Sequence, residues 1–239
     1  MKKRTKNSIG NTLRKGSLKS LLNESLTDYY WIGFILADGW ISHKTGQLVV
    51  GISEKDKDHL KKLALFLNTE SHLIREEKDT DFFGASYKCK PKYRVAVQDP
   101  NVTMRIIKKF GFLSQKTFNP PKMDFNKMTK NKFLSFFTGY VDGDFNISLA
   151  KHRKGFRNCI RVECHKNYIP FLNILEQELY KRLKFTLLRS HVYKNKKGFA
   201  MWYISKQLLI RKLKNLVNNL NIPVLERKWD NVYQGGHML

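Results

Sequence analysis

WIGFILADGWIS, residues 31–42, and FTGYVDGDFNIS, residues 137–148, are two versions of one pattern within a chain of 239 residues. The aligned pairs are Gly33 with Gly139, Ala37 with Gly143, Asp38 with Asp144, Ile41 with Ile147, and Ser42 with Ser148. Asp142 aligns with Leu36, so only the last aspartate of each version has an acidic counterpart. An internal repeat of this kind indicates two structurally similar halves.

The segments that follow each version repeat as well. Two short stretches with strand character come first, then an amphipathic helix, a second pair of strands and a closing helix. In the first half these expected elements are 40–44, 47–55, 57–68, 71–78, 92–98 and 102–110. In the second half they are 145–150, 158–166, 170–183, 185–194, 199–206 and 206–220. The sequence therefore predicts an α+β fold in which the order α-β-β-α-β-β-α occurs twice.

This repeat divides the chain into four parts. A basic N-terminal arm spans residues 1–24, and the two repeats span residues 25–113 and 129–239. The linker between them, residues 114–128, contains two consecutive prolines, which preclude a continuous helix and favour an extended chain. No apolar run reaches the roughly 18 residues that a membrane span requires, so no membrane partner is expected.

The composition is strongly basic. Lys and Arg number 45 against 20 acidic residues, which gives a formal charge of +25 and favours a polyanionic partner. Three cysteines without a CxxC pair argue against a disulfide framework and against secretion. Richness in Lys, Asn, Phe and Ile is compatible with an organelle (mitochondrion or chloroplast) or with a phage or bacterial cytoplasm, and the compartment stays open.

The repeated stretches carry small residues at helical spacing. Gly33 and Ala37 are four residues apart, as are Gly139 and Gly143, so each expected helix has a strip of small residues on one face. Such a strip lets two helix backbones approach closely. The large apolar residues around it suit a buried interface, and ordinary core packing explains this much of the pattern.

Packing does not explain the acid at the end of each helix. Side-by-side helices related by a pseudo-twofold axis bring Asp38 and Asp144 to neighbouring positions. Each carboxylate stands at the negative end of a helix dipole, and like charges disfavour one another further. A divalent cation relieves both penalties, and Mg²⁺ binds through one or two carboxylates together with phosphate oxygens. The pattern thus favours metal-assisted hydrolysis of a phosphodiester.

WIGFILADG and FTGYVDGDF resemble the two signature motifs of single-chain LAGLIDADG homing endonucleases. The resemblance extends over most of the chain, through the motif spacing and the repeated element order. It implies a pseudo-twofold saddle, in which two four-stranded antiparallel sheets arch over DNA with the two motif helices at the centre. It also implies a monomer, without an obligate protein partner, that cuts both strands of a long asymmetric duplex site and leaves short 3′ overhangs.

The same resemblance implies roles for particular residues. Two or three Mg²⁺ ions bind between the motif helices, and Ca²⁺ is expected to support binding without cleavage. The metal ligands carried over are the carboxylates of Asp38 and Asp144 and the backbone carbonyls of Ala37 and Gly143. The catalytic residues carried over are Asp38, Asp144, Lys116, Lys228 and Glu163. For each lysine a solvated surface position is an equal alternative, and for Glu163 so is a salt bridge on the strand face; Gly51, its counterpart, has no side chain for this role.

One residue departs from the family pattern. The final glycine of the motif is Gly39 in the first version but Phe145 in the second. A residue with a Cβ tolerates fewer backbone conformations. We therefore expect altered local geometry after Asp144 rather than loss of activity.

DNA reading is expected from polar side chains on one face of each sheet, because a two-stranded ribbon fits the major groove. The candidates are His43, Lys44, Gln47, Arg75, Lys88, Arg94, Gln98, Lys151, Arg153, Arg157, Arg161, Arg189, Tyr193, Lys194 and Lys196.

Two other functions are compatible with the same features. One is an RNA maturase that assists intron splicing on this fold, and the other is a DNA-binding regulator that does not cleave. Retention of both Asp38 and Asp144 favours the endonuclease, because carboxylates at a DNA-facing surface repel phosphate unless they hold a cation.

Overall fold

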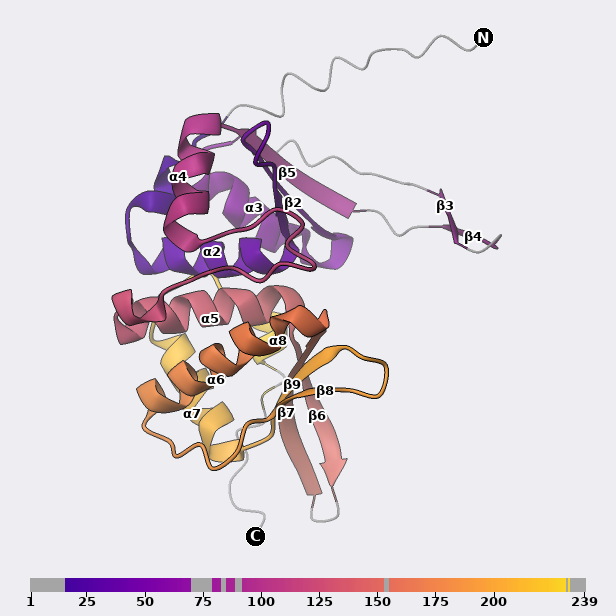
Figure 1. The fold of residues 1–239 in the computed structure, drawn as a ribbon, viewed down its shortest axis with the longest axis vertical. Helices are drawn as coiled ribbons and strands as arrows, with labels where there is room; N and C mark the ends of the chain where they lie inside the picture. The colour runs from indigo at the N-terminus through magenta and orange to yellow at the C-terminus, as the bar shows by residue number, and fades with distance from the viewer. Residues whose placement is uncertain are drawn as a thin grey trace.

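Two similar halves meet along a central pair of helices, α2 (Leu26–Asp38) and α5 (Lys130–Asp144) (Figure 1). The computed structural model describes residues 16–69, 79–82, 85–88, 92–152, 155–230 and 232. In Figure 1 the sheet of the first half lies above the helix pair and the sheet of the second half lies below it, and further helices of each half lie beside its sheet. Within these described ranges, every helix is too short or too polar to cross a lipid bilayer.

Both central helices begin after a residue whose side chain caps the helix N-terminus. Ser25 caps α2 through a capping box, because its hydroxyl accepts from the backbone N–H of Asp28 while the Asp28 carboxylate accepts from the N–H of Ser25. Thr129 caps α5 by accepting from the N–H of Lys132. Both helices are apolar on nearly all sides, which is typical of helices buried at the centre of a protein.

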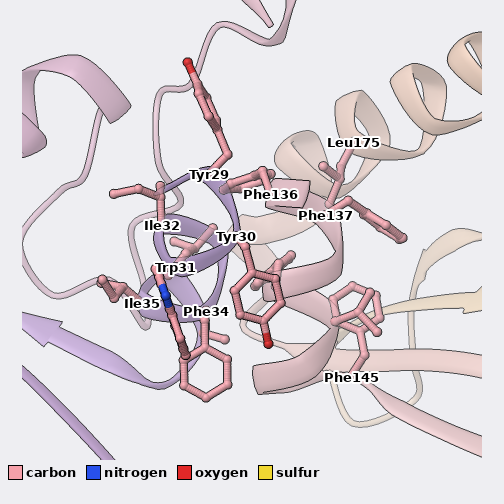
Figure 2. Close-up of a cluster of buried hydrophobic side chains, with 14 of the residues drawn as sticks. Tyr29, Tyr30, Trp31, Ile32, Phe34, Ile35, Phe136, Phe137, Phe145 and Leu175 are labelled. Atoms are coloured by element: carbon pink, nitrogen blue, oxygen red, sulfur yellow. The ribbon is translucent and has the colours of Figure 1, made fainter. Parts of the chain in front are cut away.

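The small residues lie where the two helices touch, as the sequence predicts. A Cβ added at Gly33 would stand 2.0 Å from the carbonyl oxygen of Phe136, and one added at Gly139 would stand 1.9 Å from the carbonyl oxygen of Tyr30. Neither distance leaves room for a methyl group, so glycine is required at both crossings. Figure 2 shows the aromatic side chains of the two helices, Tyr30 and Phe34 among them, packed around this contact.

The first half contains an antiparallel sheet of three strands in the order β1-β2-β5 among the residues that the structure describes. Its elements are β1 (Gly39–Ile41), β2 (Gln47–Ser53), η2 (Glu54–Asp56), α3 (Lys57–Phe66), β5 (Lys92–Gln98) and α4 (Pro100–Phe110), with a separate hairpin of β3 (Asp79–Phe82) and β4 (Ala85–Lys88). The strand expected at 71–78 lies outside the described residues. Burial alternates along β2, which places Leu48, Val50 and Ile52 in the core.

The second half has the predicted four-stranded antiparallel sheet, in the order β6-β7-β9-β8. Its elements are β6 (Asn146–His152), β7 (Gly155–Cys164), η4 (Lys166–Tyr168), α6 (Ile169–Leu183), β8 (Val192–Lys194), β9 (Ala200–Ile204), α7 (Gln207–Asn218) and α8 (Glu226–Trp229). Together the two sheets and the central helices confirm the predicted α+β class.

One predicted strand is mostly wrong. The segment 185–194 forms a strand only over its last three residues. The buried carboxylate of Glu176 on α6 accepts from the backbone N–H of His191 at 3.1 Å and from the hydroxyl of Ser190 at 2.8 Å. Because these groups bond to a helix side chain, the chain approaches the sheet as a loop.

Asp142, which has no acidic counterpart in the first repeat, is buried between the two halves. Its carboxylate accepts from the Tyr30 hydroxyl at 2.7 Å, the Leu225 N–H at 2.8 Å and the Trp229 Nε1–H at 2.7 Å. Burial raises the pKa of Asp142 to about 6, and the three donors oppose that rise. A buried carboxylate with several donors is a structural connection. Asp142 therefore joins α2, α5 and the C-terminal segment.

His59 extends this network. The Tyr30 hydroxyl donates to Asp142, so it accepts from the Nε2–H of His59 at 2.8 Å. The buried Nδ1 of His59 has no partner among the described residues, which suits a neutral ring. Burial lowers the pKa of His59 to about 4.

A pH dependence of stability follows from His59. Between its folded and unfolded pKa values the unfolded chain binds a proton that the folded protein does not, so stability falls as the pH falls through this window. Between about pH 7.5 and about pH 5 the loss from this residue is expected to be about 2 kcal/mol. Denaturant unfolding of the wild type and of His59→Gln at both pH values measures it. Equal pH dependence in the two proteins would contradict the assignment.

Candidate functional site

The C-terminal ends of α2 and α5 lie together, and each ends in one of the paired aspartates. A Cβ added at Gly143 would stand 2.1 Å from the Cβ of Ala37 and 3.5 Å from Oδ2 of Asp38. Asp144 is the last residue of α5, and its side chain, like that of Asp38, is exposed. The structure thus brings Asp38 and Asp144 to one end of the helix pair.

The surrounding protein removes part of the water around both carboxyl groups, and this shifts their pKa values. It raises the pKa of Asp144 to about 6, and the nearby charge of Asp38 adds to the rise. It raises the pKa of Asp38 as well. In both cases Lys116 and Lys228 oppose the shift. The side chains remain exposed at the protein surface, so they are open to a cation or to a nucleic acid.

Each predicted lysine binds the end of one motif helix. Lys116 Nζ donates to the carbonyl oxygens of Ile35 at 3.3 Å and Leu36 at 2.6 Å, and also to that of Ala37. These oxygens belong to the last turn of α2, where the helix itself leaves carbonyls short of partners; that of Ile35 also accepts from the backbone N–H of Gly39. An ammonium there also opposes the negative end of the helix dipole.

Lys228 repeats this arrangement on α5. Its Nζ donates to the carbonyl oxygens of Val141 and Gly143, each at 3.1 Å, and of Phe145 at 2.8 Å. Loss of hydration lowers the pKa of Lys228 and lowers that of Lys116 to about 8, while Asp38 and Asp144 oppose both shifts. Two carboxylates and two ammonium groups therefore form one charged cluster, called here the helix-end cluster: Asp38, Asp144, Lys116 and Lys228.

The oxygen atoms of this cluster suit a hard cation. The carbonyls of Ala37 and Gly143, predicted as metal ligands, each accept a hydrogen bond from a lysine, so they lie where a positive charge is stabilised. In the ranges that the structure covers, no group of three or more His, Cys, Asp or Glu side chains is placed to hold a metal. Mg²⁺ commonly binds through only one or two carboxylates, so the pair fits it.

The prediction that Phe145 alters the backbone after Asp144 is wrong. Gly39 has φ −83° and ψ 162°, and Phe145 has φ −87° and ψ 149°. Both residues are extended, a conformation open to any side chain. Phe145 is buried against Tyr140 and Trp202 in the core of the second half, so the side chain that replaces the motif glycine contributes to packing.

Glu163 lies outside the helix-end cluster in this structure. It is exposed on β7, opposite Met201, and its carboxylate accepts from Nδ2 of Asn195 at 2.9 Å. Gly51 occupies the matching position on β2, and a Cβ added there would meet only the carbonyl oxygen of Tyr93, at 3.7 Å. The described contacts of Glu163 thus connect it to the β8–β9 hairpin rather than to the lysines.

The residues predicted to contact DNA lie on strands, in turns and in an exposed loop. Strand register puts six of them on the faces of the sheets that point away from the core: Gln47, Arg94, Gln98, Arg157, Arg161 and Tyr193. Four others lie in turns or an exposed loop: His43, Lys44, Arg189 and Lys196. Lys88 ends β4 and Lys151 lies on β6. Arg75 and Arg153 lie outside the described residues.

Lys194 is placed differently from its neighbour. It pairs with the buried Ala200 at the end of edge strand β8, so it shares the core-facing side of that strand, although it is exposed. The outward position belongs to Tyr193. Its hydroxyl contacts the sulfur of Met201 at 2.9 Å.

The sequence reasoning missed residues beside the helix-end cluster. A cleft of about 510 Å³ next to Asp38 and Lys228 is also lined by Asp56, Lys92 and Asn146. A smaller pocket of about 220 Å³ adjoins Lys116 and is lined mainly by apolar side chains. The alternation of side chains along the strand that follows the motif could have indicated Asn146, the second residue after Asp144. No local pattern marks Asp56.

Among known proteins, solved structures share this fold. No protein-family model and no curated protein sequence matches the chain. Among solved structures, the homing endonuclease I-WcaI bound to its DNA recognition sequence is similar, with a TM-score of 0.58, 12% identity and coverage of 99% of this chain and 96% of that chain. The LAGLIDADG homing endonuclease I-GzeII in complex with its DNA target gives a TM-score of 0.53 at 13% identity, covering 84% of this chain and 88% of that chain. The predicted resemblance is therefore confirmed in three dimensions, and this chain has the LAGLIDADG homing endonuclease fold.

Proposed function

We propose that this protein is a site-specific double-strand DNA endonuclease of the intron-homing type, which uses Mg²⁺ and leaves short 3′ overhangs. The observation that carries the proposal is the helix-end cluster, in which one carboxylate and one ammonium group from each half lie at a single end of the helix pair. One chain supplies both sets, so a monomer suffices to cut both strands.

The net charge and the sheets support DNA as the substrate. A formal charge of +25 draws the protein to a phosphate backbone. The outward face of the first sheet carries Arg94 and two Gln side chains, and that of the second sheet carries Arg157 and Arg161; both residue types can pair with base edges in the major groove. The reading of a long asymmetric site follows from two sheets whose outward residues differ.

The carboxylates of Asp38 and Asp144 would hold the magnesium ions, with the carbonyls of Ala37 and Gly143 beside them. Magnesium, when bound, supplies Lewis-acid stabilisation of the negative charge that develops on a phosphate during hydrolysis. In the overall reaction a water oxygen bonds to phosphorus, the bond from phosphorus to the leaving sugar oxygen breaks, and that oxygen takes up a proton.

The lysines act on the same phosphates. With a pKa of about 8, the Lys116 Nζ keeps its proton at neutral pH, yet it releases that proton more readily than an ordinary lysine. Each ammonium can stabilise charge on a phosphate oxygen through its positive charge, and it can donate a proton to the leaving oxygen once it releases one of its three bonds to helix carbonyls. Lys116 and Lys228 are thus assigned one scissile phosphate each.

Selection from a library of duplexes tests the proposal. Duplexes are first recovered by binding in Ca²⁺ and are then incubated with the protein in Mg²⁺, with a chelator as the control. The expected result is binding without cleavage in Ca²⁺, and cleavage of both strands with short 3′ overhangs in Mg²⁺. Sequencing of the cut ends measures the overhang.

Two outcomes would favour the alternatives. A wild-type protein that binds a duplex tightly but never cuts it in Mg²⁺ would indicate a non-cleaving regulator. Tighter binding to a structured intron RNA than to any duplex, together with faster splicing, would indicate a maturase. Weaker binding at high salt is expected under all three functions and distinguishes none of them.

A further inference from the structure

The helix α8, which carries Lys228, is fastened to the first half of the chain. The guanidinium of Arg227 donates to both carboxylate oxygens of Asp56, with Nε–Oδ1 at 2.5 Å and Nη2–Oδ2 at 2.6 Å. Asp56 is the last residue of η2. A two-point bond between guanidinium and carboxylate fixes orientation as well as distance. The residue next to Lys228 is thus held by the opposite half.

The segment that carries Lys116 is fastened from the other side. The hydroxyl of Tyr168 donates to the backbone carbonyl of Lys116 at 2.5 Å, and Nδ2 of Asn167 donates to the carbonyl of Phe118 at 2.9 Å. Tyr168 is the last residue of η4. The linker segment that binds the end of α2 is thus held by the second half.

Asp56 and Tyr168 occupy the same place in the two halves. Each ends the short 3-10 helix between the second strand and the following helix, and the spacing from Asp56 to Tyr168 equals the spacing from Lys116 to Lys228. We propose that Asp56, with Arg227, and Tyr168 are positioning residues, through which each half holds the lysine-bearing segment of the other. These two contacts are called here the cross-ties.

Cleavage of each DNA strand depends on a different cross-tie. This inference rests on the proposed function, which gives the lysines their role. One cross-tie is an ion pair beside the larger cleft, and the other is a hydrogen bond between neutral groups. A lysine that moves by a fraction of an ångström from its phosphate contact loses rate steeply. Loss of one cross-tie is therefore expected to slow one strand and spare the other.

Variants that preserve charge distinguish an effect on the position of a lysine from an effect of lost charge. Arg227→Lys keeps the positive charge but loses the two-point geometry, and Tyr168→Phe removes only a hydroxyl. Strand-specific rates are measured in single turnover on a target labelled on each strand. Lys116→Met and Lys228→Met first identify which strand depends on each lysine.

The expected pattern is reciprocal. Arg227→Lys slows the strand that depends on Lys228, and Tyr168→Phe slows the strand that depends on Lys116, each by about 10-fold to about 100-fold. Nicked intermediates accumulate with opposite strands intact in the two variants. Equal slowing of both strands, an unchanged strand ratio, or the reverse pairing would overturn the inference.

Glu226→Gln is the matched control. Glu226 lies on the same short helix and pairs with Lys62 of the first half at 3.4 Å, both side chains being largely exposed. Its loss removes an ion pair between the halves without touching a cross-tie. Both strand rates are expected to stay at the wild-type value.

Hydrogen exchange gives a readout that needs no cleavage. Arg227→Lys is expected to speed exchange at the amides of Lys228 and Asp230, which bond to the carbonyls of Leu225 and Glu226. Tyr168→Phe is expected to speed it at the amides of Phe118 and Asn119, which bond to Gln115. Selective loosening in the two variants, together with wild-type protein that cuts no DNA, would refute the proposed function and leave the cross-ties standing. Wild-type protein that cuts DNA, with variants that alter neither exchange nor strand ratio, would refute the cross-ties alone.

Discussion

Asp38→Asn and Asp144→Asn are each expected to abolish double-strand cleavage in Mg²⁺ while the protein still binds its target. Asparagine keeps the size of the side chain but removes the negative charge that holds a divalent cation. The loss of rate is expected to reach at least about 10³-fold for each variant, in line with removal of a group that stabilises the transition state. Single-turnover cleavage and gel-shift binding in Ca²⁺ measure the two properties separately.

A matched control makes this result specific. Asp58→Asn removes a carboxylate that is largely exposed on α3 and that, among the described residues, forms its ion pair with Lys61 at 2.6 Å. Its cleavage rate is expected to equal that of the wild type. Retention of wild-type cleavage by either Asp38→Asn or Asp144→Asn would contradict the assignment of that acid, whereas loss of folding would appear as lost binding.

Gly139→Ala is expected to have the largest effect on stability. The added methyl group would stand 1.9 Å from the carbonyl oxygen of Tyr30, a backbone atom that cannot rotate away. The helices must separate along a contact that runs through the centre of the molecule. The free energy of unfolding is expected to fall by about 3 kcal/mol or more, at the upper end of the range for overpacked cores.

Gly51→Ala provides the comparison for that measurement. Among the residues that the structure describes, its Cβ would meet the carbonyl oxygen of Tyr93 alone, at an ordinary distance of 3.7 Å. Alanine there is expected to leave stability unchanged or raise it slightly, since it restricts the unfolded chain. Denaturant unfolding of both variants tests the difference, and equal stabilities would show that the helices accommodate the methyl group.

The repeat made much of this structure predictable. Gly33 and Gly139 stand at helical spacing from other small residues, and a pattern of that length carries the helix, its buried face and the aspartate at its end. The positions of Asp38 and Asp144 at one end of the pair then follow from symmetry. These features depend on residues close together in sequence.

Features that depend on residues far apart in the chain could not be predicted from the sequence. The bonds of Asp142 go to Tyr30, Leu225 and Trp229, each more than 80 positions away in the chain, and nothing local marks them. Residues 185–191 have strand-like composition, but Glu176 binds the hydroxyl of Ser190 and the backbone N–H of His191 at the end of this segment. Contacts of this kind override local preference, because strand propensity is weak beside a satisfied buried carboxylate.

The buried acid between the halves also determines which halves can be combined. Two copies of the second half would bury two Asp142 carboxylates facing Phe136, which aligns with Tyr30 and offers no hydroxyl. Two copies of the first half would set Tyr30 hydroxyls against Leu36, which offers no acceptor. Each half therefore loses the bond between Tyr30 and Asp142 when it pairs with a copy of itself and keeps that bond when it pairs with the other half. A hybrid enzyme built from either module must supply the missing donor or acceptor on the grafted one.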